Sequence, residues 1–319
     1  MIDYIKATKH LQSKDNPFLG HCNLEAEYSS GWGKYSIQGV EKLNLWHNHI
    51  ASMLRLEGSI MYYWQGHNFT YNRKDFVSAI KYIGTIINVS LWDAMIEAFE
   101  YGTIIEVQGK PKNYIQHHTA APNEGLTMNE KPKDKGNFRW YDDKNVSLKM
   151  YDAGRNIEYK QGLKRKSIIK EAGWNPEGDY LKWEAHYLKP EILNHGKGVL
   201  LADLVNPNWE NVFKEDLYLQ YKRLIPMKSI STPNKKSDLH TTDIIVLQLV
   251  ESSLNEGKSL QEVKKMLYNR INSISDDILT KADKDSRKRQ IKVLLEKIKE
   301  EPESKWDLST KIEEALSII

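Results

Sequence analysis

Two stretches in which polar and apolar residues alternate constrain the fold of this chain most strongly. In residues 146–151 the apolar set is Val146, Leu148 and Met150, and the polar set is Ser147, Lys149 and Tyr151. In residues 180–188 the polar set is Lys182, Glu184 and His186. Side chains of a strand point alternately to its two faces, so residues two apart share a face. Both stretches are therefore expected to be strands with one apolar and one polar face.

The sequence around these stretches predicts further strands and some helices. Short apolar runs separated by Gly and Asn over 24–64 are typical of strands and turns, and residues 52–62 alternate like a half-buried strand. Residues 73–98 carry apolar side chains at helical spacing and predict two consecutive helices. A strand is expected at 99–107, which is rich in Ile, Thr, Tyr and Val, followed by an irregular excursion at 108–137 with several Pro and Gly.

The character of the sequence changes near residue 237. Apolar residues recur at three-and-four spacing over 243–299, which predicts helices. Residues 229–237, with a proline and two lysines, are the natural linker. We therefore expect an α+β domain at 1–228 with a central antiparallel sheet and flanking helices, a linker at 229–237 and a helical C-terminal domain at 238–319.

Composition excludes several classes of protein. No run approaches the roughly 18 apolar residues of a membrane span, and the first residues lack the apolar core of a signal peptide. The single cysteine, Cys22, excludes an internal disulfide framework and a zinc ribbon. Hydrophobic residues make up 40% and charged residues 28% of the chain, a balance typical of soluble globular proteins. We expect a protein of a reducing interior with no membrane partner.

The net charge of +3 is too small to indicate a nucleic-acid partner by itself, so the position of the charges matters. Two segments are rich in basic residues: Lys160, Lys164, Arg165, Lys166 and Lys170 in the first, and Lys281, Lys284, Arg287, Lys288, Arg289 and Lys292 in the second. Each segment either contacts phosphate or is a solvated surface. The candidate DNA-binding residues are Lys164, Arg165, Lys166, Arg287, Lys288 and Arg289.

The polar faces of the strands offer a candidate metal site. If the three predicted strands share a sheet with their polar faces together, Glu100, Glu184 and His186 surround Tyr151. Two carboxylates and an imidazole suit Mg²⁺ or Mn²⁺. Such an ion polarises a phosphodiester, and a tyrosine hydroxyl can attack the phosphorus. The alternative is that these polar faces are ordinary solvated surfaces.

Three segments resemble, in order and spacing, the motifs of a known family. Residues 56–69 read Leu-Glu-Gly-Ser-Ile-Met-Tyr-Tyr-Trp-Gln-Gly-His-Asn-Phe, residues 148–152 read Leu-Lys-Met-Tyr-Asp, and residues 181–186 read Leu-Lys-Trp-Glu-Ala-His. They are similar to the Gly-Ser and Gly-His/Asn-Asn element, the Tyr-Asp strand and the glutamate strand of the gene II/X rolling-circle replication initiators of filamentous phages and related plasmids. The resemblance covers roughly residues 50–225.

The resemblance implies a protein that nicks one strand of a circular DNA at an origin, stays bound through a tyrosine and reseals the strand. The family's nucleophile falls on Tyr151 and its strand glutamate on Glu184. The acidic residue of its earlier strand falls on Glu100, or on Glu97 if the register slips. The implied partners are single-stranded or origin DNA, with a host helicase and polymerase, in the cytoplasm of a bacterial host cell.

The chain departs from the family in two places. Members often have a lysine after Tyr-Asp, whereas Ala153 and Gly154 follow Asp152 here, so the basic group must come from elsewhere, with Lys149 and Arg155 as candidates. The glutamate strand has a lysine and a histidine where arginines are common. These departures keep open a second hypothesis, a non-catalytic DNA-binding protein of phage or plasmid origin. A third is an unrelated structural phage protein.

Other residues with the right chemistry are weaker candidates. Tyr141, ten residues before Tyr151, is the rival or a second nucleophile. His47 and His49 match the His-x-His metal-binding pair of many rolling-circle nucleases. In that pair the central residue is usually bulky and apolar, whereas Asn48 is polar. His67 is expected in a turn.

Overall fold

The structure is a computed structural model that describes residues 1–37, 43–227, 230–231, 241–256, 258–296, 299–300 and 306–317. By their internal contacts these residues form two compact units, one built mainly from 1–225 together with 308–319 and the other mainly from 226–307. The predicted linker at 229–237 lies, apart from 230–231, outside the described residues. The predicted domain boundary therefore stays a prediction.

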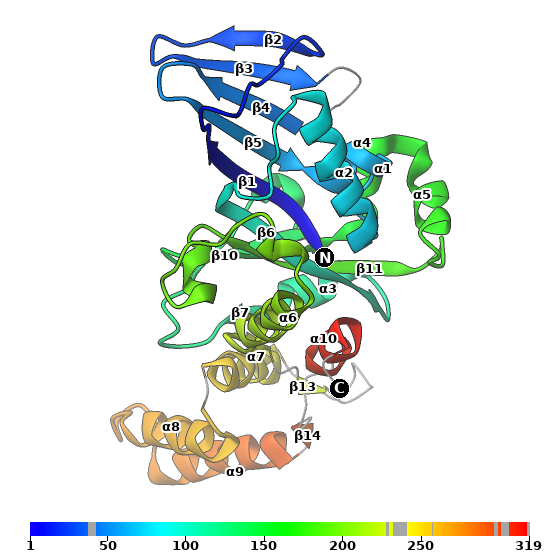
Figure 1. Ribbon diagram of the computed structural model, residues 1–319. Coiled ribbons are helices and arrows are strands. Elements are labelled where there is room, and N and C mark those ends of the chain that lie inside the picture. Colours follow the sequence, from blue (N-terminus) through cyan, green and yellow to red (C-terminus); the bar gives the residue numbers. More distant parts are fainter. Residues whose placement is uncertain are drawn as a thin grey trace. The chain divides into compact units, whose positions relative to one another are not determined.

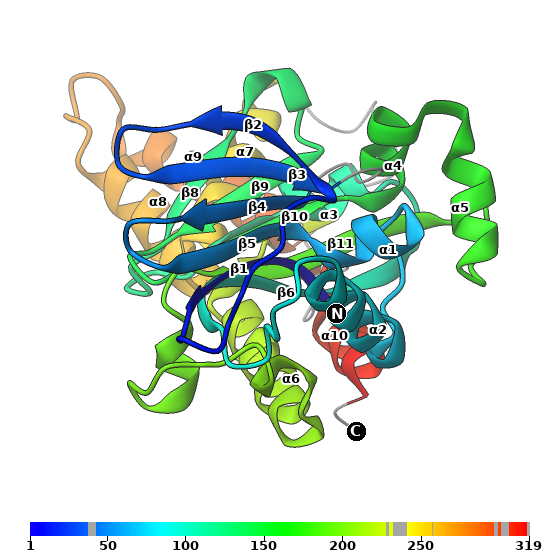
Figure 2. The ribbon, with the colours of Figure 1, turned by 45° about the horizontal axis from the view of Figure 1, so that its top comes forward.

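An antiparallel sheet dominates the first unit, as the sequence predicts. Ten strands of the described chain follow the order β2-β3-β4-β5-β1-β6-β11-β10-β9-β8 (Figures 1 and 2). Their bounds are β1 Ile2–His10, β2 Cys22–Glu27, β3 Trp32–Ile37, β4 Leu43–Asn48, β5 Met53–Ser59, β6 Met95–Val107, β8 Thr127–Glu130, β9 Phe138–Asp142, β10 Val146–Asp152 and β11 Asp179–Tyr187. The short strands β7 His118–Ala120 and β12 Leu224–Pro226 lie outside this sheet.

Helices flank the sheet, which confirms the predicted fold class. In the first unit they are α1 Ile60–Gln65, α2 Arg73–Ile86, α3 Pro111–Gln116, α4 Ala153–Gln161, α5 Arg165–Glu171, α6 Pro207–Lys222 and α10 Ser309–Leu316, with short 3₁₀ helices at Pro132–Asp134, Gly162–Lys164, Pro190–Asn194 and Asp203–Val205. On one face of the sheet Trp183 donates from its indole to Leu217 O of α6 (3.2 Å), and Arg139 donates to Ile115 O of α3 (3.1 Å). We call the other face, which carries Glu100, Lys149 and Glu184, the polar face.

Two sequence-based expectations are wrong in detail. The second helix predicted within 73–98 is absent from the described chain there, because α2 ends at Ile86, Asn88 takes a left-handed conformation (φ 56°) and strand β6 begins at Met95. Pairing of β6 with β1 overrides its helical spacing. The strand predicted at 52–62 ends at Ser59, whose side chain caps α1 by accepting from Tyr62 N. The excursion at 108–137 contains the edge strand β8.

The second unit is mainly helical, as predicted. It contains α7 Thr241–Asn255, α8 Leu260–Asn272 and α9 Lys281–Glu296, and the short strands β13 Ile230–Ser231 and β14 Lys299–Glu300 pair with each other. The buried apolar side chains of the three helices form one cluster: Leu247, Val250, Leu254, Val263, Leu267, Leu294 and Leu295. Ser259 and Glu262 form a capping box at the start of α8, which fixes that helix boundary.

Helix α10, from the C-terminal part of the chain, belongs to the first unit. Leu308, Ile312 and Leu316 are buried, and Leu308 N donates to Tyr221 Oη of α6 (2.8 Å). Burial of three large side chains contributes on the order of 5 kcal/mol. A chain ending at residue 307 is therefore expected to unfold at clearly lower temperature than the full chain in a calorimetric scan. An unchanged first-unit transition would contradict this packing.

Candidate active site on the polar face of the sheet

The strand register brings the sequence-predicted residues together. Across β10 and β11, Lys149 lies opposite Glu184, and across β11 and β6, His186 lies opposite Glu100. Tyr151 lies two residues from Lys149 on the same face. All five side chains therefore come from three neighbouring strands.

A glycine of β6 allows the neighbouring strand β11 to place Glu184 at the centre of the site. Gly102 lies opposite Glu184, and a Cβ at residue 102 would lie 2.6 Å from Glu184 Cβ and 2.7 Å from the backbone O of Trp183. A Cβ does not approach carbon or backbone oxygen atoms so closely, so any larger residue must displace the strand that carries Glu184.

Gly102→Ala is therefore expected to lower the free energy of unfolding by about 1–3 kcal/mol. Gly198→Ala is the matched control, because a Cβ there would meet the flexible end of Met95 and not backbone. Urea denaturation of both variants checks this. Equal stability of the two variants would show that the close approach at Gly102 imposes no constraint.

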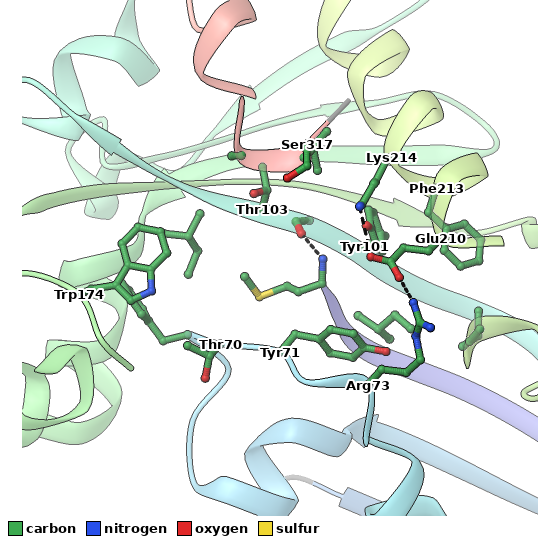
Figure 3. Close-up of a pocket in the computed structure, with 18 residues that line it drawn as sticks. Thr70, Tyr71, Arg73, Tyr101, Thr103, Trp174, Glu210, Phe213, Lys214 and Ser317 are labelled. Carbon is green, nitrogen blue, oxygen red and sulfur yellow. Dashed lines mark hydrogen bonds and ion pairs between the residues drawn. The ribbon is translucent and has the colours of Figure 1, made fainter. Parts of the chain in front are cut away.

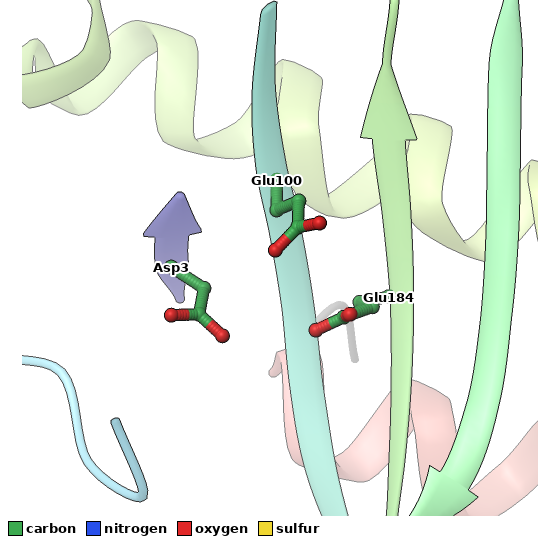
Figure 4. Close-up of side chains that lie close together, drawn as sticks. All are labelled: Asp3, Glu100 and Glu184. Carbon is green, nitrogen blue, oxygen red and sulfur yellow. The ribbon is translucent and has the colours of Figure 1, made fainter. Parts of the chain in front are cut away.

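Asp3 joins the two glutamates through an irregularity in β1. Ile2 pairs with Tyr101 and Ile5 with Phe99, so Asp3 and Tyr4 together oppose the single residue Glu100. An extra residue of this kind is a β-bulge, which redirects side chains. Carboxylate oxygens of Asp3, Glu100 and Glu184 lie within 4.8 Å of one another, and Figure 4 shows the three groups pointing to a common centre.

Two lysines neutralise part of this acidic cluster. The buried Lys182 Nζ lies 2.5 Å from Asp3 Oδ2 and 2.8 Å from Glu184 Oε2. Lys149 donates to Glu100 and its Nζ lies 3.7 Å from Glu184 Oε1. Buried charges are tolerated when they are paired in this way. With both lysines charged, one of the three negative charges stays uncompensated when the carboxylates are ionised.

Tyr151 is buried against this cluster, with 7% of its surface exposed. Its hydroxyl donates to Glu184 Oε2 (3.2 Å), Lys182 Nζ lies 5.7 Å from the centre of its ring, and Phe138 stacks on it with ring centres 5.7 Å apart. Burial, with the negative charge of Glu184, raises the pKa of Tyr151 well above 10. The phenol is therefore protonated near neutrality.

The two glutamates have opposite electrostatic environments. Burial raises the pKa of Glu184, although the positive charge of Lys182 acts to lower it. Burial also raises the pKa of Glu100, but two other effects outweigh it. The hydrogen bond with His186 and the charge of Lys149 lower the pKa of Glu100 to about 2. His186 Nδ1 lies 3.0 Å from Glu100 Oε1. Glu100 is therefore the fixed negative charge of the cluster, and Glu184 is the carboxylate that holds a proton more readily.

A pocket of about 460 Å³ opens onto these residues. Tyr62 of α1 and Asn156 of α4 form parts of its walls. Two residues of the segment 56–69 hold Asp3: Ser59 Oγ donates to Asp3 Oδ1 (2.9 Å) and Asn68 donates to Oδ2. The Gly-Ser and Asn-containing segment thus positions a carboxylate from a distant strand.

Sequence reasoning missed Asp3 and gave Lys182 no role. Asp3 lies at the start of β1 among Ile2, Tyr4 and Ile5, residue types that favour a strand, but the bulge that turns it toward Glu100 depends on pairing with β6 and has no local signal. Lys182 shares the predicted polar face of β11 with Glu184, and this shared face was the available signal.

The rival residues lie elsewhere. Tyr141 is fully buried on the face of β9 opposite to Tyr151, and burial raises its pKa to about 12. His47 and His49, on and just after β4, are not among the residues that line the pocket. His67 Nδ1 accepts from Phe69 N (3.3 Å), as expected for a turn residue.

The predicted DNA-binding residues lie on or just before two separate helices, and their roles stay predictions. On α5, Lys166 pairs with Glu177 (2.6 Å) and Arg165 reaches Gly178 O (3.5 Å), while Lys164 is exposed just before the helix. On α9 of the second unit the three residues are Arg287, Lys288 and Arg289, and Lys288 lies 3.5 Å from Asp285.

A second pocket of about 370 Å³ lies beside the start of β1, lined in part by α6 and α10. Figure 3 shows Arg73 and Lys214 directed at the Glu210 carboxylate, with Tyr71, Tyr101 and Trp174 around the cavity. Arg73 donates to Glu210, and Lys214 Nζ lies 3.3 Å from it. The acidic cluster belongs to the other pocket.

Comparison with protein-family models and with curated proteins gives no match. Among solved structures, the chain is similar to the rolling circle replication initiator protein from Geobacillus stearothermophilus. The identity is 10%, the similarity covers 79% of this chain and 96% of that chain, and the TM-score is 0.37. Every helix of the described chain is too short or too polar to cross a membrane.

Proposed function

We propose that this chain is a replication initiator that nicks one DNA strand and joins its 5′ end to Tyr151. The observation that supports it best is the contact between the Tyr151 hydroxyl and Glu184 in a pocket that three carboxylates and Lys149 also line, with the buried Lys182 paired to Glu184 behind it. Phosphoryl transfer to a tyrosine requires three things: a nucleophile, a group that accepts its proton, and positive charge near the phosphate.

In this mechanism Tyr151 Oη attacks the phosphorus of the scissile phosphodiester. A bond forms between Oη and phosphorus, the bond from phosphorus to the 3′ oxygen breaks, and the 3′ oxygen takes up a proton from water to leave a free 3′ hydroxyl. Glu184 Oε2, which accepts the hydrogen bond from Tyr151, is placed to take the phenolic proton. The ammonium groups of Lys182 and Lys149 stabilise negative charge at the phenolate and the phosphoryl group.

Asp3, Glu100 and Glu184 are the residues that would hold a divalent ion. Their oxygens lie close enough to share one ion, and carboxylate oxygens are the ligands that Mg²⁺ and Mn²⁺ prefer. A bound ion would polarise the phosphoryl oxygen. His186 stays a predicted ligand, and its contact with Glu100 connects it to the site.

Asp3→Asn is expected to weaken Mn²⁺ binding about tenfold or more, because it removes the negative charge of one of the three carboxylate ligands. Isothermal titration with MnCl₂ alone measures this without a DNA substrate. Glu97→Gln is the matched control, since Glu97 contacts Thr8 and Lys6 away from the cluster and represents the alternative register. Equal affinity of Asp3→Asn and the wild type would remove Asp3 from the proposed ligands.

The proposed activity is tested with a circular single strand, Mn²⁺ and the full chain. We expect a nicked product and a protein–DNA adduct that survives denaturation, and neither product when EDTA is present. A circle that stays intact under both conditions would contradict the proposal.

The burial of Tyr151 favours the second candidate, a DNA-binding protein without nicking activity. That candidate predicts retention of the circle on the protein without cleavage. DNA is the partner on which both candidates agree, whereas a host helicase and polymerase remain predicted partners.

A further inference from the structure

We infer that the aromatic side chains of Phe138 and Trp140 on β9 form a track for unpaired bases that starts beside Tyr151 and runs along β9. This inference rests on the proposed function and identifies where the substrate strand would lie. Its occupant is a single DNA strand with unpaired bases.

Three aromatic rings follow one another on the polar face. Tyr151 lies opposite Phe138 in the pairing of β10 with β9, and their ring centres are 5.7 Å apart. Trp140, two residues further along β9, has its ring centre 5.5 Å from that of Phe138. Phe138 also lines the pocket that holds Tyr151. The row therefore begins beside the ring of Tyr151 and continues along β9.

The outer two rings keep part of their surface accessible. Phe138 and Trp140 are half-buried, whereas Arg139 and Tyr141 between and beyond them are buried on the opposite face beside α3. Aromatic rings on an open sheet face can stack on nucleic-acid bases of any sequence.

Positive charge accompanies the rings. Lys131 Nζ lies 5.5 Å from the centre of the Trp140 ring, and Lys149 lies opposite Trp140 in the register. Lys133 and Lys135, in the exposed segment just before β9, add two further cations against the carboxylate of Asp134, while the Asp142 carboxylate accepts a hydrogen bond from the Trp140 indole (2.8 Å). Phosphates of a strand whose bases stack on the rings would meet these cations.

The test compares two fluorescent probes of equal phosphate number, a 12-mer of deoxythymidine and the corresponding abasic 12-mer. Wild-type protein is expected to bind the strand with bases about tenfold more tightly by anisotropy, since stacking on an aromatic side chain has effects of this size. Trp140→Ala is expected to lose this preference and Trp140→Phe to keep it. Trp140→Leu keeps apolar bulk on the strand without a ring, and it is expected to lose the preference while its thermal unfolding stays close to wild type.

Trp46→Ala is the matched control, a half-buried tryptophan of the same sheet on β4. It is expected to bind like the wild type. A preference for bases that survives in both Trp140→Ala and Trp140→Leu overturns the inference, as does an equal loss in Trp46→Ala or a wild type that binds neither probe. A preference that depends on Trp140, in a protein that leaves the circular strand intact, would support the track and reject the nicking activity.

Discussion

Replacing Tyr151 with phenylalanine is expected to abolish the covalent protein–DNA adduct and to lower nicking by a factor on the order of 10⁴ or more, since no other group takes over the role of the nucleophile. The change removes one oxygen and no carbon. Glu184 Oε2 keeps its contact with Lys182 at 2.8 Å, so the loss of one hydrogen bond costs about 1 kcal/mol of stability. The fold and the affinity for single-stranded DNA should therefore persist.

Tyr141→Phe is the control for this variant, because Tyr141 lies on the opposite face of β9. It is expected to nick like the wild type. Nicking by Tyr151→Phe at the wild-type rate would show that Tyr151 is a packed tyrosine at the edge of a pocket and not the nucleophile.

Replacing Glu184 with glutamine is expected to abolish nicking and also to destabilise the protein. The variant keeps the size of the side chain but removes the charge that faces Lys182 and Lys149, and with it the basic carboxylate oxygen placed to take the phenolic proton. Loss of one partner of a buried ion pair costs about 3 kcal/mol. Binding of single-stranded DNA should change little, because the groups expected to contact the phosphates are basic side chains and not this carboxylate.

Chemical denaturation and a nicking assay with Mn²⁺ check the two parts of this expectation separately. Glu177→Gln is the control, because its pair with Lys166 is exposed and the loss of an exposed pair has a small effect. A Glu184→Gln variant that nicks normally would remove Glu184 from the mechanism, whatever its stability.

The sequence was sufficient to predict the strands that carry the site, because alternation is local. The polar sets on β10 and β11 are adjacent in the sheet as expected, and the predicted Glu100 faces His186 in the register. The prediction failed where distant pairing decides the outcome. Met95 and Ile96 satisfy a helical spacing but pair with β1 in a strand, and Asp3 enters the site only because a bulge in β1 turns it toward Glu100.

The lysines illustrate a second limit. A lysine on a polar strand face is usually solvated, and only the placement of Asp3 and Glu184 on either side of Lys182 makes it a buried ion-paired group. The roles of Ser59 and Asn68 also depend on distant contacts, because their shared hydrogen-bond partner Asp3 is more than fifty residues away in the chain.

The most direct test of the central proposal is mass spectrometry of the protein–DNA adduct after nuclease and protease digestion. We expect a peptide that contains residues 146–152 and carries one nucleotide on Tyr151. A nucleotide on Tyr141, on another residue or on no residue of the protein would contradict the proposal.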